Sequence, residues 1–406
     1  MISDKQKKIL AFPYSQYDAL ICDGAVRSGK TSIMMWAFVK WAMDNFSGQR
    51  FGICGKTVDS ASKNIVVPFT SMTLAKERYI IRWRRSEKIL EVRRGAVTNL
   101  FEVFGGKDES SFTLIQGRTL AGVLLDEVVL MPRSFVEQAM TRCSVEGAKL
   151  WFSCNPGSPQ HWFYVEWIQR HKERNALYLH FKMTDNPGLS EKTLARYKAM
   201  FTGVFFQRYI QGEWVLAEGI IYPMFDKDSP VPTIERKYSR YVISMDYGIQ
   251  NPTAMLLWGF CDGVWYQVDE YYHSGRETSR QKTDQEYYED LERLAGDRYI
   301  ESLIVDPSAS SFIEVVKRQR RFRVRKANND VIEGIQKTAS AIQQGKIKVN
   351  DCCKRTIKEY GLYSWDQKTG EDRPIKDNDH AMDATRYFVS TMNIMKPKSD
   401  YRSLLV

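Results

Sequence analysis

Short apolar runs alternate with longer amphipathic segments along most of the chain, and this pattern predicts an α/β protein. The apolar runs are bounded by glycine, proline or acidic residues, as expected for strands buried in a parallel sheet. They predict strands at residues 18–22, 51–55, 122–125, 150–153, 241–246, 263–270 and 302–306. Apolar residues at helical spacing predict helices at 32–46, from 56 to about 75, 278–296, 329–344 and 377–393. Residues 78–104 alternate instead, which predicts antiparallel strands with a turn near Arg94 and Gly95.

An irregular stretch at residues 212–235 separates two such α/β patterns. It contains Gly219 and the prolines Pro223, Pro230 and Pro232, which interrupt regular structure. Because 406 residues exceed one typical domain, we expect a domain boundary here. In the first pattern, the alternation of strands and helices places a ligand at the carboxyl ends of the parallel strands.

A phosphate-binding loop is predicted at residues 24–31, Gly-Ala-Val-Arg-Ser-Gly-Lys-Thr, which fits G-x-x-x-x-G-K-[ST]. A predicted strand precedes it and a predicted helix follows it, as the motif requires. The start of a helix offers unpaired N–H groups and a positive dipole end to a phosphate, and glycines let the backbone approach it. We therefore expect ATP, with Lys30 on the terminal phosphates and the Thr31 hydroxyl on Mg²⁺. The expected nucleotide contacts are Gly24, Ser28, Gly29, Lys30 and Thr31.

Polar residues at the ends of two later strands would face the same site. Asp126 and Glu127 follow the run 122–125; the aspartate would hold Mg²⁺ through water and the glutamate could polarise the attacking water. The alternative for this acidic pair is a helix cap. Asn155 could sense the γ-phosphate, or could serve only as a turn residue before Pro156.

Two further positions could take part in nucleotide chemistry. Arg27 lies inside the phosphate loop, where a cation can neutralise charge in the transition state, or it could point outward. Gln16 belongs to the aromatic and amide segment 12–17, which could support a purine or could equally be a packing anchor.

Three aspartates in the second pattern lie at the ends of different predicted elements. Asp246 and Asp306 end buried strands, and Asp383 lies in the helix 377–393. Carboxylates that converge from two strands and a helix can hold two divalent cations, Mg²⁺ or Mn²⁺, which stabilise the attacking and leaving oxygens of a phosphodiester. Each acid alone would more often be a cap or a surface residue, but together they have the order and spacing of an RNase H-like nuclease.

His380 and Glu270 could complete this site. His380 lies three residues before Asp383, on the same face of a helix, and Glu270 ends a predicted strand. Between these acids lies the basic run 317–326, in which alternation would place Arg321, Arg323 and Arg325 on one face suited to a phosphate backbone. The alternative for this run is a solvated helix end followed by a strand.

Composition agrees with a polyanionic partner but does not prove one. The formal net charge is +10, which also is a common solubility feature. Seven scattered cysteines without a C-x-x-C pair indicate free thiols in a reducing compartment rather than disulfides or a zinc site. No signal peptide or membrane-spanning run is recognisable, so we expect a cytoplasmic-type protein with no membrane partner.

The ordered set of motifs resembles the large terminase subunit of tailed bacteriophages, the motor that packages DNA into capsids. The resemblance covers nearly the whole chain and is closest to the PBSX-type branch. The segments that carry it are 24–31, 124–127, 153–156, 184–187, 212–214, 246–248, 305–307 and 379–387. The last of these, Asp-His-Ala-Met-Asp-Ala-Thr-Arg-Tyr, is the most specific.

This resemblance implies a P-loop ATPase domain with a parallel-rich sheet, followed by an RNase H-like nuclease domain. The implied division is ATPase at 1–185, lid or linker at 186–235, nuclease at 236–394 and a C-terminal tail at 395–406. The implied activities are ATP-driven translocation of double-stranded DNA into procapsids and metal-dependent cutting of concatemeric DNA. Asn155 then falls in the motif that couples hydrolysis to movement.

The resemblance also implies partners. These are a small terminase subunit that selects DNA and the portal protein of the procapsid. The chain would act as a ring-shaped homo-oligomer in the host cytoplasm, docked on the procapsid. Many relatives carry the arginine of the phosphate loop earlier than Arg27.

Two other functions fit parts of the pattern. A repair or recombination ATPase fused to a nuclease would share both sites but would unwind a forked duplex without any portal. An inactive prophage-encoded scaffold that binds capsids would have no need for Lys30 and the acidic residues, all of which are present.

Overall fold

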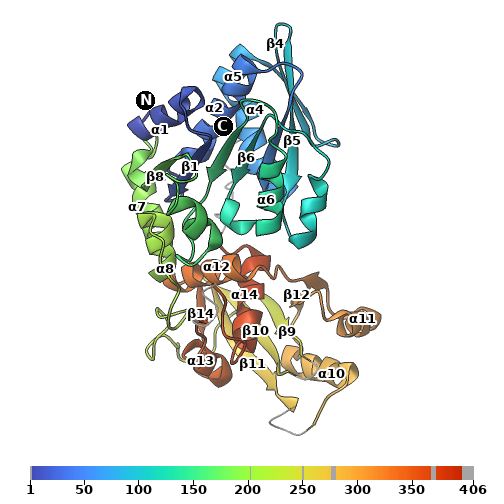
Figure 1. The fold of residues 1–406 in the computed structure, drawn as a ribbon. Helices are drawn as coiled ribbons and strands as arrows, with labels where there is room; N and C mark the ends of the chain where they lie inside the picture. Colours follow the sequence, from blue (N-terminus) through green and yellow to red (C-terminus); the bar gives the residue numbers. More distant parts are fainter. Residues whose placement is uncertain (1, 202, 249–250, 276–279, 367–371, 396–406) are drawn as a thin grey trace, which may run out of the picture. The chain divides into compact units, whose positions relative to one another are not determined.

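The computed structural model describes residues 2–201, 203–248, 251–275, 280–366 and 372–395 (Figure 1). The predicted tail from residue 396 onward lies outside this part of the chain. Internal contacts divide the chain into two compact units, Met1–Lys198 with Val204–Leu216, and Ala199–Gly203 with Ala217–Val406. The expected lid segment 186–235 is therefore shared between the two units, and its role stays a prediction.

The first unit is built on an eight-stranded sheet in the order β3-β4-β5-β2-β6-β7-β1-β8. Its strands are β1 Ala19–Gly24, β2 Arg50–Gly55, β3 Ile80–Arg84, β4 Ile89–Arg94, β5 Val97–Gly105, β6 Gly122–Asp126, β7 Lys149–Ser153 and β8 Ala176–Phe181. All neighbours from β5 to β8 are parallel, whereas β3, β4 and β5 form an antiparallel meander with its second turn at Gly95. The parallel-rich sheet is confirmed, and β8 is an additional strand that the sequence pattern did not reveal.

Helices cover both faces of this sheet. The helices of this unit are α1 Asp4–Ala11, α2 Lys30–Asn45, α3 Val58–Ala61, α4 Val67–Ser71, α5 Thr73–Arg78 and α6 Arg133–Thr141. Two further helices, α7 Glu191–Met200 and α8 Gly203–Phe206, each contain residues of both units. Short 3₁₀ turns occupy Phe12–Tyr14, Glu109–Leu114, Val128–Leu130 and Met183–Asp185, and π-helical turns occupy Ser62–Val66, Tyr164–Ile168 and Gln207–Gln211. The predicted helix from 56 to 75 runs as helical turns from Val58 to Ser71, with a π-helical turn before Val67, and is interrupted at Met72, whose backbone is extended.

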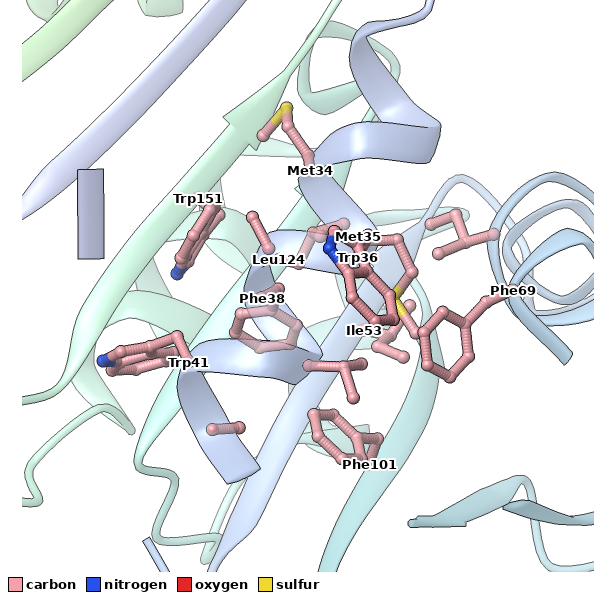
Figure 2. Packing of buried hydrophobic residues seen from close by; sticks show 14 of the residues in the cluster. Met34, Met35, Trp36, Phe38, Trp41, Ile53, Phe69, Phe101, Leu124 and Trp151 are labelled. Atoms are coloured by element: carbon pink, nitrogen blue, oxygen red, sulfur yellow. The ribbon is translucent and has the colours of Figure 1, made fainter. Parts of the chain in front are cut away.

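The helix after the phosphate loop is fixed by one of the two cores of this unit. Figure 2 shows α2 surrounded by aromatic and aliphatic side chains from the strands and from α4. Phe38 of this helix lies edge-on to Trp151 of β7, with ring centroids 5.6 Å apart. Both side chains are buried, so Phe38→Ala would cost roughly 3–5 kcal/mol. This packing holds the start of α2, and with it the loop, against the carboxyl ends of the strands.

The second unit has a six-stranded sheet in the order β13-β12-β9-β10-β11-β14. Its strands are β9 Arg240–Asp246, β10 Thr253–Cys261, β11 Val264–His273, β12 Ile300–Val305, β13 Val324–Lys326 and β14 Ile347–Val349. The pairs β9–β10 and β10–β11 are antiparallel, whereas β12 is parallel to β9. Three antiparallel strands next to a parallel strand agree with the predicted RNase H-like domain.

Helices of the second unit pack on this sheet. They are α10 Asp284–Ala295, α11 Ser310–Gln319, α12 Val331–Gln343, α13 Lys354–Tyr360 and α14 His380–Met392. Within this unit α14 lies over β9 and β10 (Figure 1), where Phe388 stacks on Trp258 with centroids 4.2 Å apart. The predicted helix 278–296 begins only at Asp284, because Thr283 and Glu286 form a capping box there; residues 276–279 lie outside the described residues.

Candidate active sites

Two glycines give the phosphate loop its shape. Gly24 has φ +116°, and a side-chain carbon there would lie 2.0 Å from the carbonyl oxygen of Phe181. Gly29 is the residue before α2 and adopts φ +80°, a conformation that favours glycine. The loop therefore runs directly from the end of β1 into the N-terminus of α2, which is the geometry that binds anions.

The loop lysine and threonine meet polar groups from two neighbouring strands. Lys30 Nζ donates to Asn155 Oδ1 at 2.7 Å and to the carbonyl of Ala25 at 3.1 Å. Thr31 Oγ1 donates to Asp126 Oδ1 at 3.0 Å and lies 3.3 Å from Ser153 Oγ. Since β1, β6 and β7 are parallel neighbours, their carboxyl ends bring all these groups to one edge of the sheet.

Burial shapes the charges at this edge. It raises the pKa of the Asp126 carboxyl, although hydrogen bonds from Ser153 and Thr31 and the charge of Lys30 oppose this shift. Burial likewise lowers the pKa of Lys30, against the nearby acidic groups. Both charged side chains are thus held with little water around them, where added phosphate or a divalent cation would interact strongly.

The residues of the loop fit a phosphate and a cation. Ser28 is buried, and within the described ranges its hydroxyl has no hydrogen-bond partner. An unsatisfied buried hydroxyl in an anion-binding loop is a group available to a phosphate oxygen. The Thr31 hydroxyl and the Asp126 carboxylate form the oxygen donor set that Mg²⁺ prefers.

Glu127 stands beside this donor set in a strained conformation. It has φ +55°, a left-handed value that is uncommon for a residue with a side chain, and it is half-buried. Such strain is held in place by the surrounding structure and is frequent at functional sites. The turn changes the direction of the chain directly after Asp126, so Glu127 does not continue the alternation of side chains that a regular strand would have.

Two of the predicted nucleotide residues have exposed side chains. Arg27 is exposed, and its guanidinium stacks 5.8 Å from the ring centre of Tyr197 on α7. Gln16 is exposed at the opposite edge of the sheet, before the start of β1, where its carbonyl accepts a hydrogen bond from Asn175. The strand β1 separates Gln16 from the loop by about 20 Å of extended chain, and a contact of Gln16 with a nucleotide stays a prediction.

The amide that does lie beside the loop is Gln6. It is buried on α1, and its Nε2 atom would be 2.7 Å from a side-chain carbon at Gly29. Asn186 approaches from the other side and donates to the carbonyl of Arg27 at 2.7 Å. Neither residue belongs to the phosphate-loop motif, and only the buried side of α1 could have indicated Gln6.

A buried carboxylate ties the end of β1 to distant parts of the first unit. Asp23 is fully buried and accepts hydrogen bonds from His180 Nδ1 at 2.9 Å and from Trp214 Nε1 at 2.7 Å. In the next turn of the loop, the Val26 N–H donates to the carbonyl of Tyr209. The segment 204–216 is therefore fastened to the phosphate loop, a connection that the sequence did not reveal.

The acids of the second unit lie at one edge of its sheet. Asp246 ends β9, Asp306 follows the parallel strand β12, and Asp383 lies in the first turn of α14. The charge of Asp383 reaches Asp246: together with burial, which is the main cause, it raises the pKa of Asp246. The structure thus brings the predicted residues to the same end of the unit.

Each of these acids already has a partner within the protein. Asp246 accepts a hydrogen bond from His380 Nδ1 at 2.9 Å, and Asp306 accepts one from Tyr387 at 2.8 Å. Although burial disfavours the charged form of His380, the contact with Asp246 outweighs it and raises the histidine pKa. In the described part of the chain, no group of three His, Cys, Asp or Glu residues is close enough to hold a metal ion.

Basic residues hold the helical acids. Asp383 accepts from the buried Arg386 at 3.0 Å, and Lys376 Nζ lies 3.2 Å from both Asp379 Oδ2 and Asp383 Oδ2. The residue types still fit divalent cations, because carboxylates from two strand ends and a helix are hard oxygen donors. Among these carboxylates, Asp383 is paired with Arg386 and Lys376, Asp246 with His380, and Asp306 with the Tyr387 hydroxyl.

Two further acids of the second unit, Glu359 and Glu270, make contacts that the sequence pattern does not indicate. Glu359 accepts hydrogen bonds from Tyr272 at 2.8 Å and from the Ala381 N–H at 2.7 Å, so it caps the helix that carries His380. Burial raises the pKa of Glu359 to about 7. Glu270, expected as a further ligand, instead accepts hydrogen bonds from the first residues of α13.

The basic run 317–326 is partly committed to internal contacts. Arg321 forms an ion pair with Glu292 at 3.0 Å, and Arg325 donates to the carbonyl of Thr391 at 2.9 Å. Only Arg323 of the three alternating arginines makes no such contact within the described residues. The alternation itself is short, because β13 covers only residues 324–326.

Comparison with known proteins agrees with this architecture. A family model described as the terminase large subunit, T4likevirus-type, N-terminal domain matches residues 21–227, and the terminase RNaseH-like domain matches residues 243–391. No curated protein matches the chain. As for membranes, every helix in the described ranges is too short or too polar to cross a bilayer.

Solved structures of one relative, the large terminase of a thermophilic bacteriophage, match over nearly the full length. One crystal form of this terminase is 51% identical, with a TM-score of 0.93 over 97% of this chain and 99% of that chain. Its complex with ADP is 50% identical, with a TM-score of 0.92 over 97% and 100% of the two chains. Its complex with ATP-gamma-S is also 50% identical, with a TM-score of 0.90 over 96% and 98%. The chain therefore belongs to the large terminase family of DNA-packaging proteins, with an ATPase domain followed by an RNase H-like nuclease domain.

Proposed function

We propose that the first unit hydrolyses ATP in order to drive double-stranded DNA into a procapsid. The observation that carries this proposal is the meeting of Lys30 with Asn155 and of Thr31 with Asp126 at one sheet edge. The terminase of the thermophilic bacteriophage, which was solved with ADP and with ATP-gamma-S, supports a nucleotide at this place.

The residues divide the work by their chemistry. Lys30, Ser28 and the N–H groups at the start of α2 would bind the phosphates, and Thr31 and Asp126 would hold Mg²⁺. When bound, Mg²⁺ neutralises charge on the phosphate oxygens. Glu127 would orient and deprotonate the attacking water.

Asn155 accepts a hydrogen bond from Lys30 through its side-chain oxygen. A phosphate that binds Lys30 would compete with this 2.7 Å contact and release the Asn155 side chain. Such an exchange would let the strand end of β7 respond to nucleotide, which is the coupling role that its motif implies.

The second unit would cut DNA with divalent metal held by Asp246, Asp306 and Asp383. These carboxylates would position Mg²⁺ or Mn²⁺, which when bound stabilises both oxygens of the cleaved phosphodiester. His380 would keep Asp246 oriented at the edge of the site. Binding of metal requires that the cationic neighbours of the acids give way.

The proposed partners follow from packaging. They are double-stranded DNA, a small terminase subunit and the portal protein. The chain would act as a ring-shaped homo-oligomer docked on the procapsid in the host cytoplasm. The net charge of +10 supports a polyanionic partner.

The proposal is tested by measuring ATP hydrolysis with and without linear duplex DNA, and plasmid cleavage with Mg²⁺ or Mn²⁺. We expect hydrolysis that DNA stimulates, cleavage that EDTA abolishes, and DNA uptake only with procapsids. Absence of ATP hydrolysis under all conditions would contradict the proposal. Unwinding of a forked duplex without procapsids would instead favour the repair or recombination enzyme.

A further inference from the structure

Half of the net charge of the chain is concentrated in one short segment of the first unit. Residues 76–94 contain eight basic and three acidic residues, a net charge of +5 out of +10 for 406 residues. The segment consists of the end of α5, strand β3, a turn and strand β4. We call it the basic hairpin; it forms one edge of the eight-stranded sheet.

The two faces of the basic hairpin differ in composition. Ile81 and Trp83 of β3 pack with Leu90 and Val92 of β4 against the hydrophobic core. The other face exposes charge, because successive strand residues point to opposite sides. Its basic members on the strands are Arg82, Arg84 and Arg93. The core face therefore fixes the strands, and the charged face is presented to solvent.

Most of the cations on the basic hairpin have no acidic partner. Arg84 pairs with Glu87 and Glu91, and Arg94 pairs with Asp44. The remaining cations are exposed and form no ion pair within the described residues. They are Lys76, Arg78, Arg82, Arg85, Lys88 and Arg93. These cations repel one another, and an anionic partner that covered them would relieve this repulsion.

A second observation sets this surface apart from the basic run 317–326. In that run, Arg321 forms an ion pair with Glu292, and Arg325 donates to the carbonyl of Thr391. In the basic hairpin, by contrast, Arg82 and Arg85 keep their guanidinium donors free of any other residue that the structure describes. Free arginine donors are the groups that bind phosphate oxygens in a forked geometry.

We infer that the basic hairpin is the surface through which the first unit holds the phosphate backbone of duplex DNA. This inference rests on the proposed function and adds the place of contact. Of the described residues in the basic hairpin, Ile80 is the one large apolar side chain that is exposed. Interfaces between proteins usually have an apolar or aromatic centre, which this surface lacks. A surface of scattered cations on a rigid strand pair fits a regular polyanion and reads no base sequence.

The test compares two triple variants of the full-length protein. Arg82→Gln, Arg85→Gln and Lys88→Gln remove three charges from the basic hairpin. The matched control, Lys8→Gln, Lys107→Gln and Lys172→Gln, removes three exposed charges from other parts of the same unit. Binding of a fluorescent DNA duplex is measured by anisotropy over a series of salt concentrations, together with ATP hydrolysis with and without DNA.

The hairpin variant should bind DNA more weakly, and its dependence of log K on log salt should flatten by up to about 2.7, three contacts at 0.9 each. Hydrolysis without DNA should be unchanged, while stimulation by DNA falls. A variant with Arg82→Lys and Arg85→Lys should keep the parental slope, because its charge is intact. The control should keep it as well.

Several outcomes would overturn the inference. One is an unchanged salt slope in the hairpin variant, and another is an equal loss in the control. Normal DNA binding with lost binding to procapsids would assign the surface to an acidic protein partner instead. A parent protein that fails to bind DNA at all would contradict the proposed function itself, whereas a parent that binds and a hairpin variant that binds equally well would contradict only this inference.

Discussion

The two candidate sites differ in how far the protein has assembled them. At the phosphate loop, groups of complementary chemistry face each other: Lys30 contacts Asn155, and Thr31 contacts Asp126. In the second unit, Asp246 and Asp383 are each held by a cationic or histidine side chain of the same unit. The first site is assembled by parallel strand ends and by the start of α2, which directly follows the loop, whereas the second depends on α14, a helix far along the chain from β9 and β12. The first site thus presents its lysine and hydroxyl to groups that would share a nucleotide with them, whereas the acids of the second site face donors of their own unit.

The largest expected effect comes from removing one essential group from each site. Lys30→Ala should lower the rate of ATP hydrolysis by a factor of roughly 10²–10³ or more, because a positive charge at the terminal phosphates is lost. Metal-dependent nicking of plasmid by the same protein should persist. Asp246→Ala should do the reverse, since a metal centre that loses a carboxylate holds its cation poorly.

Both variants are assayed for phosphate release and for plasmid cleavage. If Asp246→Ala cuts plasmid as well as the parent does, the second unit would be better interpreted as a DNA-gripping module. If either single change abolishes both activities, the two sites are not separable, and the comparison drawn above fails.

A change at Glu127 sharpens the description of the first site. Glu127→Gln should lower the rate of ATP turnover roughly a hundredfold while nucleotide binding is kept, because the amide cannot accept a proton from water. Turnover and binding of a fluorescent ATP analogue are measured side by side. Near-normal turnover would remove Glu127 from the role of base and leave its strained turn as a purely structural feature.

A change at Glu359 tests whether this buried acid makes the stability of the fold depend on pH. Its pKa of about 7 lies above the usual value of 4.5, so the folded protein binds this proton more tightly than the unfolded chain. The carboxyl therefore stabilises the fold below pH 4.5, and this contribution, at most about 3 kcal/mol, is lost as the pH rises to 7.

Glu359→Gln should remove this pH dependence, because the amide does not titrate and its oxygen can still accept from the Ala381 N–H. Urea unfolding of both proteins in EDTA at several pH values between 4.5 and 7.5 gives the comparison. Plotted against pH, the free energies of unfolding of the two proteins should have a constant difference near pH 4.5, and this difference should change as the pH rises. Parallel curves would show that Glu359 ionises in the fold as it does in water.

The smallest expected effect concerns the competition between lysine and metal. Lys376→Ala removes a cation that lies between Asp379 and Asp383, so affinity for Mn²⁺ should rise. Lys376 is largely exposed, and a surface ion pair is worth up to about 1 kcal/mol, which limits the gain to roughly fivefold. Calorimetric titration with Mn²⁺ measures it, with Lys348→Ala as the control. Equal affinities would show that Lys376 does not compete with metal.

Much of the fold could be predicted because its signals are local. The phosphate loop, the strand before Asp126 and the strand before Asp306 are each marked by an apolar run with a polar end. Strand β10 was missed because it is covered on both faces, so its apolar residues do not alternate.

Contacts between distant segments were the part that the pattern could not provide. Gln16 lies in an aromatic and amide segment that could support a purine or serve as a packing anchor, and β1 lies between this segment and the loop. Gln6, ten residues earlier, reaches Gly29 because α1 folds back on the loop. Likewise, nothing local to Glu359 indicates that it caps the helix of His380.

The carboxylate of Asp23 has a practical consequence for dividing the chain. A fragment cut after residue 185, the boundary expected from the sequence, would lack Trp214 and the Tyr209 carbonyl. Asp23 would then lose one of its two hydrogen-bond donors, and an unsatisfied buried group costs about 1–3 kcal/mol or more. An ATPase fragment therefore has to extend to residue 216, although most of its sheet is complete 35 residues earlier at Phe181.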